Sequence, residues 1–246
     1  MKADPKDQQR LLDVQAIDTA LQQLAHRKKN LPEFAEVAGL TKVIGALEDE
    51  RVRAEVDVDD LDRDIAKLER EVEAVRQRSD RDRDRLENGR LPARELTALE
   101  HEMVSLKRRQ SELEDAELEL MEKRETGQAA LDAVDAKISS ARERREAAEA
   151  KRDLVLAEIT KEEEWKVQSR RPLVADLPAE LVELYDKIRE QSGGLGAALV
   201  RHGQCGGCRL ELYGADRARV KAAAADEVVR CEECRRIMVR TAESGL

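Results

Sequence analysis

The four cysteines are the residues of this chain whose spacing most clearly indicates chemistry. All of them lie within the last 42 residues, in two Cys-x-x-Cys pairs separated by 22 residues: Cys205 with Cys208, and Cys231 with Cys234. A Cys-x-x-Cys turn lets two thiolates reach one ion, and two such turns supply the four tetrahedral ligands that zinc prefers. The spacing therefore predicts one zinc ion per chain.

We expect this zinc ion to be structural, because four thiolates leave no open position for a water molecule. His202 lies close by in sequence but exceeds the ligand count, so it is interpreted as a surface residue or as a residue beside the ligands. A thioredoxin-like redox motif is the alternative. That motif needs a single pair on a strand-helix unit, which the tail lacks.

Short elements must position these cysteines. Apolar segments around the two pairs predict strands at 199–201, 210–213, 228–229 and 237–239, and a short helix at 216–225. The two glycines between Cys205 and Cys208 permit a tight backbone. About 45 residues with one aromatic side chain build little core, so we expect the metal to hold the tail folded.

A long apolar repeat with alternating spacings of three and four residues runs from Leu40 to Leu86 and again from Leu96 to Ile159. A repeat averaging 3.5 residues is typical of a coiled coil. Asn88-Gly89, which adopts positive φ easily, and Pro92 lie between the two stripes and predict a turn. The chain is therefore predicted to be mainly α, with an antiparallel coiled-coil hairpin roughly 80 Å long.

Folding at residue 89 places Arg51 near Gly127, and it leaves the last 20 or so residues of the returning helix, about 93–165, without a partner. We expect a first helix at 7–29 to cover that overhang, with Val14, Ile17, Leu21 and Leu24 against Val155 and Ile159.

The base is predicted to be a small helical bundle. Arg171-Pro172 is expected to break the returning helix. A helix at 178–191 and Trp165 are expected to complete the base. The glycine-rich residues 192–196 are expected to form a stop or hinge. The predicted domains are residues 1–192, the hairpin with its base, and residues 199–246, the C4 zinc ribbon.

Composition supports an extended helical protein, with 40% charged and 2% aromatic residues. Disorder would not sustain heptads. No stretch approaches the length of a membrane span, and the first residues lack the apolar core of a signal peptide, so we expect a cytoplasmic protein without membrane contact. Cysteine pairs in a reducing compartment also favour metal over disulfides.

Charge divides unevenly along the chain. Residues 199–246 carry nine basic and seven acidic residues, a net +2, whereas the chain as a whole carries −9. The basic residues are candidate phosphate contacts: Arg201, Arg209, Arg217, Arg219, Lys221, Arg230, Arg235, Arg236 and Arg240. Interleaved acids and the negative Zn(Cys)4 centre bring the tail close to neutrality, so we expect weak RNA or DNA binding at most, or an ordinary solvated surface.

The hairpin, the Glu-Leu-Thr-Ala-Leu-Glu-His-Glu segment after its turn and the Cys-Gly-Gly-Cys … Cys-Glu-Glu-Cys-Arg-Arg-Ile tail resemble bacterial C4-type zinc-ribbon proteins with a coiled-coil hairpin. Relatives in that family include a flagellar regulator that partners sigma-54 and binds a flagellin transcript, and a chlamydial protein linked to type III secretion. The resemblance implies a zinc-binding adaptor with nucleic-acid contacts. The family pattern continues Cys-Gly-Arg-Ile-Leu-Tyr after the last ligand, whereas here Arg235 replaces the glycine and Val239 the aromatic, which removes a stacking surface.

No catalytic triad, phosphate loop or paired-histidine helix is present, so the sequence predicts neither an enzyme nor a small-molecule substrate. The favoured function is a regulator or adaptor whose coiled coil binds a protein and whose ribbon contacts nucleic acid or protein. Two alternatives stay open: a transcription cofactor that inserts its hairpin tip, with Asp80, Asp82, Asp84 and Glu87, into RNA polymerase, and a pure structural scaffold.

Overall fold

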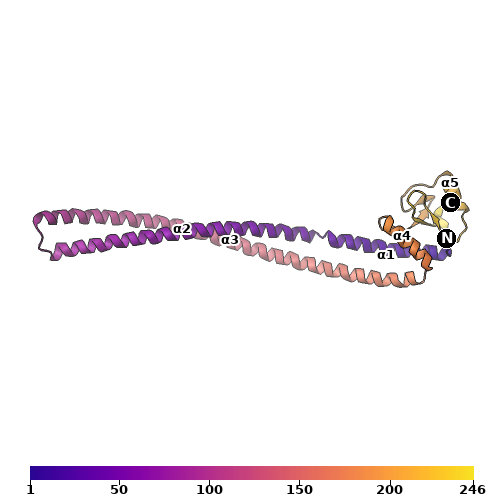
Figure 1. The fold of residues 1–246 in the computed structure, drawn as a ribbon, viewed down its shortest axis with the longest axis horizontal. Coiled ribbons are helices and arrows are strands. Elements are labelled where there is room, and N and C mark those ends of the chain that lie inside the picture. Colours follow the sequence, from indigo (N-terminus) through magenta and orange to yellow (C-terminus); the bar gives the residue numbers. More distant parts are fainter. The chain divides into compact units, whose positions relative to one another are not determined.

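The computed structural model describes residues 1–246, in which four helices precede a small sheet (Figure 1). The helices are α1 (Pro5–Lys29), α2 (Pro32–Asn88), α3 (Ala93–Ala175) and α4 (Ala179–Gln191). The tail holds β1 (Ala197–Arg201), β2 (Gln204–Cys205), α5 (Gly214–Ala222), β3 (Val229–Arg230), β4 (Ile237–Val239) and the 3-10 helix η1 (Ala242–Ser244). Contacts divide the chain into two compact units, one formed by Met1–Phe34 with Ala150–Leu246 and the other by Ala35–Glu149.

The unit Ala35–Glu149 is the predicted antiparallel coiled-coil hairpin, in which α2 and α3 run in opposite directions (Figure 1). The heptad positions form its buried seam: Leu40, Ile44, Val58, Val72, Leu99, Leu113, Val134, Ile138, Ala141 and Ala148. Ion pairs between the helices flank the seam, as between Arg124 and Asp62 (3.0 Å) and between Arg142 and Glu48 (2.6 Å). The hairpin prediction is confirmed.

The connection at the hairpin tip differs from the expected glycine turn. Gly89 does not adopt positive φ. A Cβ on Gly89 would lie 2.3 Å from the Arg85 carbonyl oxygen, so the glycine is needed for close approach instead. Pro92 begins the return as predicted, because its carbonyl oxygen accepts the backbone N–H of Glu95 at 2.9 Å.

The predicted register of the hairpin is wrong in its middle. Arg51 pairs with Asp135 at 2.9 Å and not with the region of Gly127, which lies against Val58 instead. Near the tip Arg78 pairs with Glu102, as a fold centred close to residue 90 requires, so the displacement along α3 grows from the tip toward the middle. A Cβ on Gly127 would lie 3.2 Å from Val58, so the glycine leaves room for the buried valine.

The base of the other unit is a small helical bundle, and α1 covers part of α3 as predicted. Leu24 and Leu31 pack with Ile159 in one apolar cluster, and Lys28 bonds Glu163 at 2.7 Å. Val14 differs from the prediction, because it packs against α4 in a second cluster.

Two predictions about the end of α3 are wrong. The helix continues through Pro172 to Ala175 although proline donates no backbone N–H, and the Pro172 carbonyl oxygen accepts the Asp176 N–H at 3.2 Å. Trp165 does not complete the base, because it is 62% exposed, with the Lys166 Nζ 4.8 Å from its ring centroid. At about 100° per residue, six positions rotate Trp165 well away from the face on which Ile159 meets α1.

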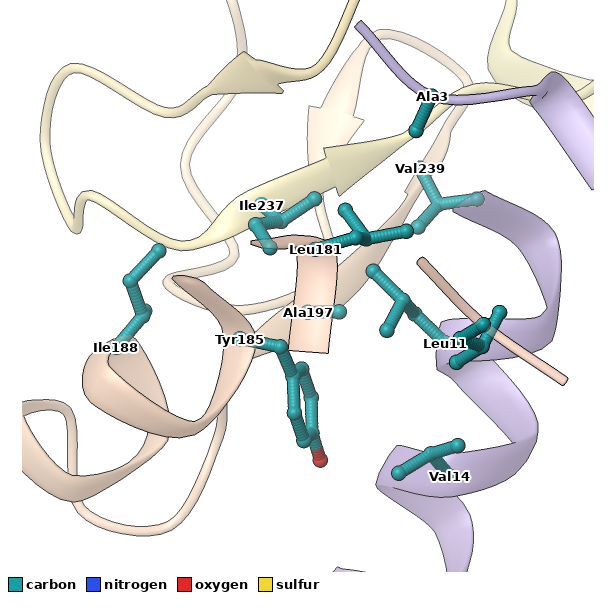
Figure 2. Close-up of a cluster of buried hydrophobic side chains, with 10 residues drawn as sticks. Ala3, Leu11, Val14, Leu181, Tyr185, Ile188, Ala197, Ile237 and Val239 are labelled. Carbon is teal, nitrogen blue, oxygen red and sulfur yellow. The ribbon is translucent and has the colours of Figure 1, made fainter. Parts of the chain in front are cut away.

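The largest core joins the base to the sheet (Figure 2). Side chains from four elements meet in it: Leu11 and Val14 of α1, Leu181, Tyr185 and Ile188 of α4, Ala197 of β1, and Ile237 and Val239 of β4. Residues on both sides of the domain boundary predicted at 192–199 therefore share one core and one compact unit.

The sheet has the strand order β2-β1-β4-β3, with β1 and β4 parallel and the other pairs antiparallel. His202 (φ 50°) and Gly203 (φ 75°) connect β1 and β2, and positive φ at both positions is typical of a tight type I′ turn. The predicted strand at 210–213 is wrong: it makes one isolated bridge, between Gln204 and Glu211, before Gly214 begins α5.

Asp18 of α1 lies at the centre of a buried polar network in the base. Its carboxylate, 1% exposed, accepts bonds from Arg170 of α3 at 2.8 Å and from the Tyr185 hydroxyl of α4 at 2.8 Å. Burial, followed by the bond to Asp18, raises the pKa of Tyr185 far above its ordinary value, so the hydroxyl stays a donor. The network ties three helices to one carboxylate.

Replacing Asp18 by alanine should destabilise this unit by about 3 kcal/mol, because it removes the buried carboxylate that pairs with the partly buried Arg170 guanidinium and accepts from the Tyr185 hydroxyl. Urea unfolding followed by circular dichroism measures the loss. Asp13→Ala, an exposed position on the same helix, is the control and should change stability by less than about 0.5 kcal/mol. Equal stability of the two variants would contradict the central role of Asp18.

Candidate metal centre

Two tight turns position the four cysteines at one end of the sheet. Cys205 closes β2, and its carbonyl oxygen accepts the Arg209 N–H at 2.8 Å, which closes the first turn. Cys231 follows β3, and its carbonyl oxygen accepts the Arg235 N–H at 2.9 Å. The two turns have the same backbone pattern and present their sulfurs to a common point.

The sulfur geometry fits a tetrahedral zinc ion. All four Sγ atoms lie within 4.8 Å of one another, with Cys205 to Cys234 at 3.8 Å and Cys208 to Cys231 at 3.9 Å. A tetrahedron with Zn–S bonds of about 2.3 Å has sulfur separations of about 3.8 Å. Disulfides would need about 2.05 Å. The four cysteines would hold one zinc ion with no position left for a water molecule, so the ion is structural.

Burial and hydrogen bonding act in opposite directions on the thiols. Burial raises the pKa of Cys205, and raises that of Cys231 to about 12, against N–H donation from the following backbone. Burial also opposes ionisation of Cys234, but bonds from the backbone N–H and the guanidinium of Arg236 lower its pKa to about 7. A bound zinc ion stabilises the thiolate form of all four.

The glycines of the first turn are needed for close packing. A Cβ on Gly206 would lie 2.7 Å from the Leu199 carbonyl oxygen, and one on Gly207 would lie 2.7 Å from the Arg236 side chain. The residue after each pair is left-handed, with φ 62° at Arg209 and 61° at Arg235. Both arginines therefore occupy a conformation that glycine adopts without strain.

His202 lies outside the cysteine cluster. It occupies the turn between β1 and β2, where its backbone N–H donates to the Glu243 carbonyl oxygen at 3.1 Å. This placement agrees with its interpretation as a surplus residue.

Most of the nine predicted phosphate contacts bond to the protein itself. The engaged residues are Arg201, Arg217, Arg219, Arg230, Arg235, Arg236 and Arg240. Arg240 alone donates to four carbonyl oxygens at the end of α5 and beyond. The structure gives the side chains of Arg209 and Lys221 no such bond. Nucleic-acid binding by this set stays a prediction.

Sequence reasoning placed Arg236 among the phosphate contacts and missed its contacts with both cysteine turns. Its carbonyl oxygen accepts the Cys231 N–H at 3.0 Å, and its Cδ lies against Gly207. The available signal was its position two residues after the last cysteine, where the backbone of such a turn approaches the sulfur.

The purified protein should contain one zinc per chain, and Cys231→Ser should lose most of it, because a hydroxyl is a poor zinc ligand. Elemental analysis after gel filtration measures the ratio. His202→Ala is the control and should keep one zinc, since His202 lies outside the cluster. Loss of zinc from His202→Ala would overturn the four-cysteine assignment.

Arg235→Gly should make the second turn more stable than Arg235→Ala by about 1 kcal/mol, because both remove the side chain and only alanine keeps a Cβ at positive φ. Zinc release during urea titration, followed with a chromophoric zinc indicator, reports the difference. Identical release curves would show that the left-handed conformation carries no strain.

Comparison with known proteins agrees with this geometry. Residues 14–193 match the CT398-like coiled coil hairpin domain, and residues 204–238 match the C4-type zinc ribbon domain. The protein Rv2229c of Mycobacterium tuberculosis is 39% identical over 240 residues, which cover 98% of each chain.

Two solved structures have a similar fold. One from Mycobacterium smegmatis has a TM-score of 0.86 and 37% identity, and the match covers 98% of this chain and 100% of that one. CT398 from Chlamydia trachomatis has a TM-score of 0.67 and 20% identity, with 96% and 98% covered, and it shows the fold alone.

None of the helices is long and apolar enough to cross a membrane. The matched domains are a coiled coil and a zinc ribbon, and the four sulfurs have the separations that zinc requires. The chain therefore belongs to the CT398-like coiled-coil hairpin family and carries a C4-type zinc ribbon with one structural zinc.

Proposed function

We propose that the protein is a non-catalytic adaptor or regulator in which the coiled-coil hairpin and the zinc ribbon each contact a macromolecular partner. The zinc centre has four sulfur ligands and no open position, which supports a structural role for the metal. The adaptor function rests on surfaces, and one of these, on the ribbon, carries the argument.

That surface is the 209–213 surface, formed by Arg209, Leu210, Glu211 and Tyr213. Leu210 is 51% exposed and Tyr213 is 71% exposed, although both belong to a small domain with few large apolar side chains. A hollow of about 480 Å³ adjoins them, lined by Arg201, His202, Gln204, Gly206, Arg209 and Glu211. Tyrosine and arginine, both present on this surface, are enriched in protein interfaces.

Charge on the ribbon favours a protein partner over nucleic acid. Seven of the nine basic side chains bond within the protein, and two acids, Glu211 and Glu243, lie beside the hollow or pair with its arginine. Nucleic-acid binding depends on cations that are available to phosphates. The 209–213 surface offers one unpaired cation, Arg209. A single cation fits the polar rim of a protein interface better than it fits binding to a phosphate backbone, which needs several cations.

The hairpin supports the second contact of the adaptor. Exposed apolar side chains lie on both of its helices: Val43, Val52, Val56, Val104, Leu118 and Met121. A groove of about 540 Å³ runs beside the seam, where Val43 and Leu47 of α2 face the small residues Ala136 and Ser140 of α3. A further helix would pack there closely.

The hairpin tip gives less support to the RNA polymerase alternative. Asp80 pairs with Arg83 at 3.0 Å, and Asp82 pairs with Arg85 at 3.7 Å and is nearly buried in the seam. Two of the four tip acids are thus already paired with neighbouring arginines.

Weak single-stranded nucleic-acid binding is a second candidate for the ribbon, because Tyr213 offers an exposed ring on which a base can stack while Arg209 and Lys221 have no partner in the protein. Such binding would fall steeply as the salt concentration rises. Charge reversal at Arg209 and Lys221 would abolish it.

The test compares three full-length variants with the wild type: Leu210→Ser with Tyr213→Ala, Arg209→Glu with Lys221→Glu, and Leu154→Ser as a control at an exposed site on α3. Each is used for affinity capture from an extract of the native host, with and without nuclease, and for gel retardation of a fluorescent single-stranded RNA. We expect protein capture that resists nuclease, is lost in the Leu210/Tyr213 variant and persists in the control.

Capture that nuclease abolishes, together with retardation lost in the Arg209/Lys221 variant, would replace the protein contact by the nucleic-acid candidate. Equal capture by the wild type and the Leu210/Tyr213 variant would remove the 209–213 surface from the proposal.

A further inference from the structure

Arg236 contacts both cysteine turns of the zinc ribbon. It follows Cys234 by two residues, and its carbonyl oxygen accepts the Cys231 N–H at 3.0 Å in the second turn. Its Cδ lies so close to Gly207, in the middle of the first turn, that a Cβ there would approach it to 2.7 Å. Contacts with both turns hold the ligands in the arrangement that zinc requires.

The same guanidinium holds the linker between the base and the ribbon. Its Nη2 donates to the Ser192 carbonyl oxygen at 2.7 Å, and its Nε donates to the Leu195 carbonyl oxygen at 3.0 Å. Both acceptors belong to residues 192–196, the glycine-rich segment that sequence analysis interpreted as a flexible stop or hinge. One residue thus joins the two cysteine turns to the linker.

Gln15 of α1 holds the linker from the base. Its Oε1 accepts the Gly196 N–H at 2.6 Å, and its Nε2 donates to the Gly194 carbonyl oxygen at 2.9 Å. The Tyr185 hydroxyl of α4 reaches the same Oε1 at 3.2 Å. The linker therefore lies between a residue bonded to the zinc ribbon and a residue bonded to the buried network of the base.

The chain continues from Arg236 directly into the shared core. The Ile237 N–H donates to the Gly196 carbonyl oxygen at 3.0 Å, and the side chain of Ile237 is fully buried with Leu181 of α4 (Figure 2). A displacement of the second cysteine turn would shift Arg236 and Ile237 together, because they are adjacent in sequence. Linker and core would loosen in the same step.

We propose that Arg236 is a positioning residue that couples zinc binding to the linker, so that the metal also controls the docking of the ribbon on α1 and α4. Four metal-bound thiolates carry net negative charge, which attracts the nearby guanidinium. Without the metal the two cysteine turns are free to separate, and Arg236 loses the contacts that orient it. Coupling between two sites is reciprocal, so a loosened linker also weakens zinc binding.

The experiment measures zinc affinity and linker protection on the full-length chain. Arg236→Gln keeps a polar side chain but cannot contact Gly207 and bond both carbonyl oxygens together. We expect its zinc affinity, measured by competition with a chromophoric chelator, to fall about tenfold or more. Hydrogen exchange at the Gly196 and Ile237 amides of the zinc-bound variant should also become faster, because the variant loses the two bonds that hold the linker.

Arg235→Gln is the matched control, since Arg235 is the adjacent arginine and its guanidinium meets only exposed Glu232. It should change neither measurement. Faster linker exchange in Arg236→Gln with unchanged zinc affinity would overturn the coupling and reduce Arg236 to a linker contact. Unchanged exchange with weaker zinc binding would overturn it as well.

A second measurement needs no variant and decides the question even if Arg236→Gln does not fold. Removing zinc from the wild-type protein with a chelator should accelerate exchange at Gly194 and Gly196, and readdition of zinc should restore protection. A linker that stays protected in the metal-free protein would show that its order does not depend on the zinc centre.

Discussion

A scarcity of aromatic side chains constrains every part of this structure. The 246 residues include one phenylalanine, one tryptophan and two tyrosines, and 40% of the residues are charged. Such a chain cannot enclose one large core. It buries aliphatic residues in a narrow seam between two long helices, and a metal centre supplements the small core of the C-terminal ribbon. Tyr185 is the one aromatic side chain that is fully buried, and it lies where the base meets the ribbon.

The base shows how polar groups supplement so small a core. Asp18 joins α1, α3 and α4 through buried bonds, and Gln15, one turn earlier, bonds the linker and Tyr185. Side-chain networks of this kind specify one arrangement, because each unpaired member would be costly. The ribbon is therefore packed and bonded to a base whose helices are themselves held by a carboxylate.

These features are consistent with an adaptor that presents surfaces on an ordered support. The metal and the shared core order the ribbon, which leaves Leu210 and Tyr213 exposed on a stable scaffold. The small size of the ribbon also explains why few of its arginines are available to a ligand. Arg240 and Arg236 donate to backbone carbonyl oxygens that regular secondary structure would satisfy in a larger protein.

The sequence by itself determined the hairpin, the zinc ribbon and the contact of Leu24 with Ile159, because heptad spacing and cysteine spacing are local patterns with few physical solutions. Tertiary structure alone decided the register that pairs Arg51 with Asp135, the exposure of Trp165 and the continuation of α3 through Pro172. It also decided that Arg236 bonds the linker. These outcomes depend on helix pairing, helix rotation and partners distant in sequence, and none of these is encoded in the spacing of neighbouring residues.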